Sequence, residues 1–187
     1  MSRLTNNLDS IADQIRLSFS AKDAAREKAL PLCREVIRHC SGAIRAVHRH
    51  EFEKATGLLQ SARNLLNQAE QAVSEYKELS NTGFIRDAQK EFAEGSITLA
   101  LVTGKQPPDP SELGIDSAAY LNGLGEAVGE LRRYLLDSMR QGNLSRGDEL
   151  LSAMDDIYNI LVTMDFPDAI TGGLRRTTDM VRGVLER

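Results

Sequence analysis

The stretch DSAAYLNGLGEAVGELRRYLLDSMR, residues 116–140, predicts one long helix. On a helix with about 100° per residue, the large apolar side chains of this segment fall on one face. Glu126 and Glu130 fall on the opposite face, and Gly125 and Gly129 lie between the two faces. A glycine destabilises a helix interior by about 1 kcal/mol relative to alanine. The Gly125/Gly129 strip therefore predicts that the backbone of another helix packs closely against this one.

The rest of the chain is dominated by the same helix-forming residue types, and no stretch shows the sustained alternation of a strand. We therefore predict an all-α fold, a single-domain helical bundle of about six to seven helices over residues 1–187. Pro31 is expected to kink the first helix or to begin a new one, and Ser145 is expected to cap the fifth. The predicted long helices cover residues 9–48, 51–79, 84–102, 116–140, 145–164 and 169–185.

The composition excludes several classes of protein. The chain has 187 residues, of which 41% are hydrophobic and 27% are charged, as in globular domains and unlike disordered chains. No apolar stretch is long enough to cross a bilayer, and the N-terminus lacks the apolar core of a signal peptide, so we expect a cytoplasmic protein with no membrane partner. Cys33 and Cys40 are too far apart along one helix, about 10 Å, for a mutual disulfide, and we expect them to be buried and reduced.

Basic residues concentrate near the start of the chain, although the net charge is −4. In the predicted first helix, Arg34, Arg38, Arg45 and Arg49 share a stripe about 60° wide, and His48 lies close to it. Guanidinium groups that are spaced along a helix can bind successive phosphates of a nucleic acid. The same stripe can be a solvated face with local ion pairs, and the residues alone leave both interpretations open.

Two pairs of glutamates lie on consecutive predicted helices. Glu91 and Glu94 are at the edge of the apolar face of residues 84–102, and Glu126 and Glu130 follow on the next long helix. We expect the two helices to pack as antiparallel neighbours, which would bring the four carboxylates together. Carboxylate oxygens suit Mg²⁺ or Mn²⁺, and paired helices can build such a metal site. Each pair can also be a solvated acidic face.

Three segments of the chain resemble the translin/TRAX family. Residues 83–94, GFIRDAQKEFAE, resemble the family segment that carries Q-E-[FY]-x-E-A, and residues 173–179, GLRRTTD, resemble G-L-R-[RK]-K-x-D. The longest match is YLNGLGEAVGELRR, residues 120–133, which resembles Y-L-x-G-x-x-D-x-x-G-E-L-x-R. The order and spacing of these segments agree over nearly the whole chain.

The chain departs from the family patterns in places. Lys90 stands where the first pattern has glutamine, and Gly95 stands where it has alanine. Glu126 stands where eukaryotic TRAX has aspartate, which keeps the charge and the ligand type but changes the reach of the side chain. The short chain without extended tails is similar to an archaeal translin-like member.

The resemblance implies a translin-like fold and, for the TRAX-like branch, a metal-dependent endoribonuclease. The catalytic, metal-binding carboxylates of that branch fall on Glu91, Glu94, Glu126 and Glu130. The implied cofactor is Mg²⁺ or Mn²⁺, and the implied partner is RNA, single-stranded or in a short duplex, with ssDNA as a further ligand. The resemblance also implies self-association into a closed homo-oligomer, typically an octamer. The residues that we expect to bind the RNA backbone are Arg34, Arg38, Arg45, His48 and Arg49.

Two other functions remain open for these residues. Translin-like chains of the same family bind single-stranded RNA or DNA, and in such a chain the carboxylates would be inert or structural. A helical oligomeric scaffold would use the glycine strip and the acidic faces for subunit packing alone. Binding of labelled RNA without chain scission in a magnesium titration would indicate the binding module, and no binding at low salt would indicate the scaffold.

Overall fold

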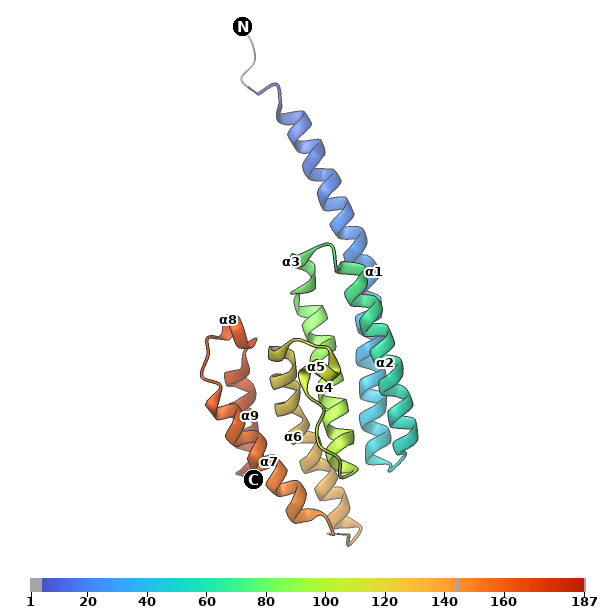
Figure 1. Cartoon of the computed structure of the whole chain (residues 1–187), viewed down its shortest axis with the longest axis vertical. Coiled ribbons are helices and arrows are strands. Elements are labelled where there is room, and N and C mark those ends of the chain that lie inside the picture. The colour runs from blue at the N-terminus through green and yellow to red at the C-terminus, as the bar shows by residue number, and fades with distance from the viewer. Residues whose placement is uncertain (1–4, 144, 187) are drawn as a thin grey trace.

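The structure, a computed structural model, describes residues 5–143 and 145–186 (Figure 1). Every regular element in these two ranges is a helix, which confirms the all-α prediction. Six of the helices have 12 residues or more, and α3, α5 and α8 are single turns of four residues. The helices are α1 (Leu8–His48), α2 (Phe52–Val73), α3 (Lys77–Ser80), α4 (Gly83–Val102), α5 (Pro110–Leu113), α6 (Ser117–Arg140), α7 (Gly147–Thr163), α8 (Asp168–Thr171) and α9 (Leu174–Leu185).

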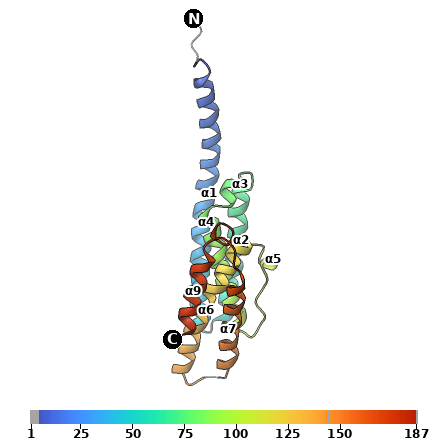
Figure 2. The same cartoon turned by 90° about the vertical axis from the view of Figure 1, so that its left-hand side faces the viewer.

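The long helices form a flat array in which α4 and α6 are central. α1 packs against α2 and α4, and α6 packs against α4, α7 and α9. Figure 1 shows these helices side by side, and Figure 2 shows how thin the array is after a turn of 90°. The N-terminal part of α1 extends beyond all other helices in both views. Over the residues that the structure describes, no helix combines the length and apolar character that crossing a membrane requires.

Helix ends differ from the prediction at several points. α1 continues through Pro31, so no new helix begins there. Pro31 is exposed. Proline has no N–H to donate to the carbonyl one turn earlier, but on the solvent side of a helix water can reach that carbonyl and bond it. The predicted helix 51–79 ends early, because a turn at residues 74–76 separates α2 from α3. The predicted helix 169–185 is divided at Gly172 and Gly173, whose φ angles of 62° and 86° suit glycine.

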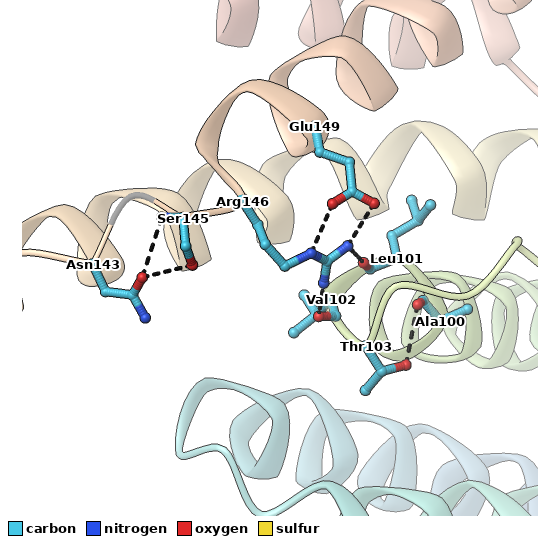
Figure 3. Close-up of polar contacts among 8 residues, drawn as sticks. All are labelled: Ala100, Leu101, Val102, Thr103, Asn143, Ser145, Arg146 and Glu149. Carbon is cyan, nitrogen blue, oxygen red and sulfur yellow. Dashed lines mark hydrogen bonds and ion pairs between the residues drawn. The ribbon is translucent and has the colours of Figure 1, made fainter.

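Arg146 ties the start of α7 to the end of α4, and Ser145 is not the predicted helix cap (Figure 3). The Arg146 guanidinium donates to the carbonyl oxygen of Val102 and, at 3.0 Å, to that of Leu101. These carbonyls belong to the last turn of α4. Carbonyl groups at the C-terminal end of a helix have no hydrogen-bond donor within their own helix. Glu149 pairs with the same guanidinium at 2.8 Å. Ser145 instead donates to the side chain of Asn143.

The prediction that α4 and α6 are antiparallel is wrong, because the two helices run in the same direction (Figure 1). Arg86, in the first turn of α4, lines the same pocket as Ala118, in the first turn of α6. The chain after α4 returns along the molecule before α6 begins, and the Tyr120 hydroxyl holds this segment by donating to Pro108 O at 2.9 Å. A connection of this length permits a parallel pair, whereas a short turn would impose an antiparallel one.

The core confirms most of the predicted apolar positions. Cys33 and Cys40 are both buried and free, as predicted. The α6 face predicted to be apolar is buried at Leu124, Val128, Leu131 and Leu135. Met139, at the end of the same predicted face, is 55% exposed.

Candidate active site

A glycine in the middle of α6 brings the two central helices into backbone contact. A Cβ atom added at Gly123 would lie 2.5 Å from Lys90 O and 2.7 Å from the Ala93 Cβ, so only glycine fits. The prediction that Gly125 and Gly129 together form one close contact with another helix is therefore wrong. A Cβ at Gly125 would meet Thr177 of α9 at 2.4 Å, and Gly129 has nothing within 4 Å. The approach to α4 thus uses a glycine two positions before the predicted pair.

The parallel contact places three predicted site residues together. Glu91 and Glu94 come from α4 and Glu126 comes from α6, and each is half-buried. One carboxylate oxygen from each lies within 4.8 Å of the others. We call these three residues the carboxylate cluster. Two of the predicted acidic side chains on α4 and one on α6 therefore share one site, as the sequence indicated.

Crowding of negative charge perturbs the carboxylate cluster. Burial is the main cause that raises the pKa of Glu94 to about 8, and the charges of Glu91, Glu126 and Glu130 raise it further. Burial also raises the pKa of Glu91 above its usual range, and the charges of Glu126, Asp87 and Glu130 raise it further. A proton or a cation relieves this repulsion. One such cation is already present, because Lys90 Nζ donates to Glu126 Oε1 at 2.8 Å.

Glu130, the fourth predicted ligand, lies next to the carboxylate cluster but bonds elsewhere. His48 Nε2 of α1 donates to Glu130 Oε2 at 2.5 Å. This hydrogen bond lowers the pKa of Glu130, and the charge of Arg133 lowers it further. The His48 side chain is only 6% exposed, so this predicted RNA-binding residue faces inward. The bond between His48 and Glu130 joins α1 to α6.

Among the described residues, α1 and α4 each carry a buried polar atom without a hydrogen-bond partner. His48 Nδ1 and Thr98 Oγ1 are buried without a hydrogen bond in the residues that the structure describes. Thr98 lies one helical turn after Glu94 on the same side of α4. Buried polar atoms in proteins usually bind a protein group, water or an ion.

The predicted arginine stripe is exposed along α1 and its C-cap. All four arginines are exposed, and Arg38 forms an ion pair with Glu35. The other three form no ion pair with any described residue, so local ion pairing accounts for Arg38 alone. His48 lies about 40° around the helix from Arg34, so the stripe lies beside the residue of α1 that bonds Glu130. The members of the stripe are Arg34, Arg38, Arg45 and Arg49.

Known proteins resemble the chain along nearly its whole length. The solved structure named "Structure of AfC3PO - duplex RNA complex" has a TM-score of 0.86 and 33% sequence identity, and the match covers 94% of this chain and 91% of that one. "Crystal structure of AfC3PO" has a TM-score of 0.85 and 32% identity, with 94% and 92% covered. The chain belongs to the translin/TRAX family.

More distant comparisons extend the similarity in fold and in sequence. The translin-like fold extends to "Crystal structure of apo-NeC3PO", with a TM-score of 0.82, 18% identity, and coverage of 100% of this chain and 95% of that one. A curated relative, "Uncharacterized protein MJ0175" of Methanocaldococcus jannaschii, is 29% identical over 171 residues, which cover 89% of this chain and 74% of the relative. No family model matches the chain.

Two of the departures from the translin/TRAX patterns contact each other. Lys90 replaces the glutamine of the first family segment, and Glu126 replaces the aspartate of eukaryotic TRAX. The ion pair between them joins α4 to α6 across the contact at Gly123. No local pattern in the sequence predicts this pair, since only the parallel register of α4 and α6 brings the two side chains together.

Proposed function

We propose that this translin/TRAX-family chain is a metal-dependent endoribonuclease that cleaves phosphodiester bonds in RNA. The observation that carries the proposal is the carboxylate cluster, with three oxygens from two helices within 4.8 Å. Oxygen ligands of this kind suit Mg²⁺ and Mn²⁺. The raised pKa of Glu94, to about 8, supports a cation there, because a positive ion would relieve the repulsion that raises it.

The residues that would hold the ion are Glu91, Glu94 and Glu126, with Glu130 close enough to act through its charge. When bound, Mg²⁺ or Mn²⁺ neutralises charge on the scissile phosphate and makes a bound water more acidic. Lys90 holds Glu126 in place from the α4 side, and His48 holds Glu130 from the α1 side. These two contacts orient the α6 carboxylates before any substrate binds.

The exposed arginines of α1 would bind the RNA backbone next to the carboxylate cluster. Contacts with phosphate carry no sequence information, so cleavage would be weakly sequence-selective. The similarity to a protein solved as a duplex RNA complex supports RNA as the substrate class, in single strands or short duplexes. Aromatic residues make up 5% of the chain, which argues against recognition by base stacking.

The test is a titration with Mg²⁺ and Mn²⁺ on end-labelled RNA, with wild-type protein and Glu126→Gln. We expect cleavage by the wild type that EDTA stops, and a loss of about 10²-fold or more in the variant with RNA binding retained. The matched control is Glu149→Gln, because Glu149 is an exposed glutamate far from the carboxylate cluster in sequence and pairs with Arg146. Wild-type rates in Glu126→Gln would remove the assignment of the metal site.

A second candidate function, a non-catalytic RNA-binding module, is favoured by one specific contact. The Lys90 ammonium already neutralises part of the charge on Glu126, at 2.8 Å. In a chain of that kind the lysine would replace the metal ion as the internal cation. RNA binding without scission at any Mg²⁺ or Mn²⁺ concentration, together with no Mn²⁺ binding in the absence of RNA, would select this function over the nuclease.

A further inference from the structure

A pocket of about 680 Å³ opens between α4, α6 and the corner that joins α8 to α9. Lys90 and Glu126 form one wall of this pocket, so it is continuous with the carboxylate cluster. The corner residues Gly172 and Gly173 form the facing wall, with Arg176 in the first turn of α9. The pocket therefore lies on the α9 side of the carboxylate cluster, and the arginine stripe lies on the α1 side.

The base of the pocket is held by a buried hydrogen-bond network around Asn122. Asn122 Nδ2 donates to Ala118 O at 2.8 Å and to Thr171 O at 2.9 Å. The Thr177 hydroxyl donates to Asn122 Oδ1 at 2.6 Å. The tight contact of Thr177 with Gly125 adds packing between α9 and α6. The network fixes the corner between α8 and α9 relative to Glu126, one turn further along α6.

Two guanidinium groups in this pocket lack partners. Arg86 is half-buried and Arg176 is exposed, and neither forms a hydrogen bond or an ion pair with another described residue. Asp87 and Asp168 line the same pocket but pair with neither arginine. A cation that is partly removed from water without a partner carries a desolvation cost. A bound anion would offset this cost for Arg86, and guanidinium groups bind phosphate with two parallel hydrogen bonds.

We propose that Arg86 and Arg176 bind a phosphodiester group of the RNA strand, next to the group held at the carboxylate cluster. The inference rests on the proposed function, because it takes RNA as the ligand. The strand would cross the carboxylate cluster with one basic site on each side, the arginine stripe on α1 and this pocket beside α9. The GLRRTTD segment of residues 173–179 thereby has a role: its glycine forms the corner, and its second arginine binds phosphate.

The experiment measures binding of a short fluorescent RNA in EDTA, so that no cleavage occurs, over a range of salt concentrations. The proteins are wild type, Arg86→Gln and Arg176→Gln, with Arg175→Gln as the matched control. Arg175 is exposed on the same helix and lines a different pocket. Each pocket variant should bind RNA about tenfold more weakly. The slope of log K against the logarithm of the salt concentration should decrease by the amount expected for the loss of about one phosphate contact. Arg175→Gln should bind as the wild type does.

A neutral backbone analogue locates the contact. The series consists of RNAs that each carry one uncharged methylphosphonate in place of a phosphodiester. At one position in the RNA, this replacement should weaken binding by the wild type. The same replacement should not weaken binding by Arg176→Gln any further. Thermal unfolding of each variant checks the fold, and Arg176→Gln carries the test alone if Arg86→Gln unfolds.

The outcomes separate this inference from the proposed function. If the wild type does not bind RNA even at low salt, both fail. If the wild type binds and cleaves RNA while Arg86→Gln and Arg176→Gln retain its affinity and salt dependence, only the pocket assignment fails. An equal loss in Arg175→Gln would also overturn it, because the effect would then come from general surface charge.

Discussion

Lys90 places a positive charge in contact with the carboxylate cluster. Its ammonium group contacts Glu126 and is itself half-buried, and the neighbouring carboxylates raise its pKa although burial opposes them. The lysine therefore stays charged and competes with an incoming metal ion. The nuclease and the binding module differ in the outcome of this competition.

Replacement of this lysine by the family residue, Lys90→Gln, should strengthen metal binding. Removal of one positive charge near three carboxylates should lower the Kd for Mn²⁺ by about tenfold. Titration calorimetry or the Mn²⁺ electron paramagnetic resonance signal measures this without RNA. The control is Lys54→Gln, since Lys54 pairs with Glu51 on the surface. An unchanged Mn²⁺ Kd in Lys90→Gln would contradict a role for Lys90 as an internal cation.

Glu94 gives the metal-free protein a stability that depends on pH. Its pKa is raised from 4.5 to about 8 in the folded chain, so the folded state binds more protons than the unfolded state between these values. Stability from this group is fully present below about pH 4.5 and is lost as the pH rises toward 8. In EDTA, the free energy of unfolding should fall over this window, with a slope of at most about 1.4 kcal/mol per pH unit.

Urea unfolding at several pH values measures this dependence. Glu94→Gln should flatten the curve, because the amide does not titrate. Saturating Mg²⁺ should stabilise the wild type most at pH 8, where the carboxylates are ionised and the repulsion is greatest. Two results together would show that Glu94 does not titrate as described. The free energy of unfolding of the wild type in EDTA would rise between pH 5 and pH 8, and Glu94→Gln would show the same pH dependence.

At the scale of the elements, the pairing of α4 and α6 depends on one glycine. Gly123 lets the α6 backbone reach Lys90 O and the Ala93 side chain. Arg146 holds the other end of α4 to the start of α7 by bonding the last carbonyls of α4. The carboxylate cluster lies between these two contacts, so the spacing of its carboxylates follows from the distance between the helices.

Gly123→Ala should force α6 away from α4. The added methyl group would lie 2.5 Å from Lys90 O, and overpacking of this kind costs about 1–3 kcal/mol. Chemical denaturation should show this loss, and Mn²⁺ binding should weaken as the carboxylate cluster widens. The matched control is Gly129→Ala on the same helix, where nothing lies within 4 Å. That variant should gain up to about 1 kcal/mol from helix propensity. Equal stability of the two variants would contradict the close contact.

At the scale of the whole molecule, the N-terminal part of α1 has an uncovered apolar face. Leu8, Ile11, Ile15 and Phe19 are between 41% and 64% exposed. They fall within about 80° of one another on the helix, with a spacing suited to packing against another helix. No other element of the described chain covers this part of α1 (Figure 1). A second copy of the chain is the partner that the expected homo-oligomer would supply.

We therefore expect Ile11→Glu combined with Ile15→Glu to lower the oligomeric state. A charge on a buried apolar seam has no partner, so the association constant should fall by about 10²-fold or more. Size-exclusion chromatography with light scattering measures the mass, and circular dichroism checks the helix. Leu17→Ser is the control, because Leu17 is 73% exposed on the opposite side of α1. A monomeric wild type, or an unchanged mass in the double variant, would contradict this role.

The sequence by itself determined the helices and the candidate ligands. Helix periodicity is a local property, so residues 84–102 and 116–140 could be identified as helices, and Glu91, Glu94 and Glu126 as candidates for one site. Only the tertiary structure decided the parallel direction of α4 and α6, the contact at Gly123, and the partners of Lys90 and His48. These depend on how helices distant in the chain rotate and slide against each other. That choice is made by side-chain packing along the whole contact, which no local pattern encodes.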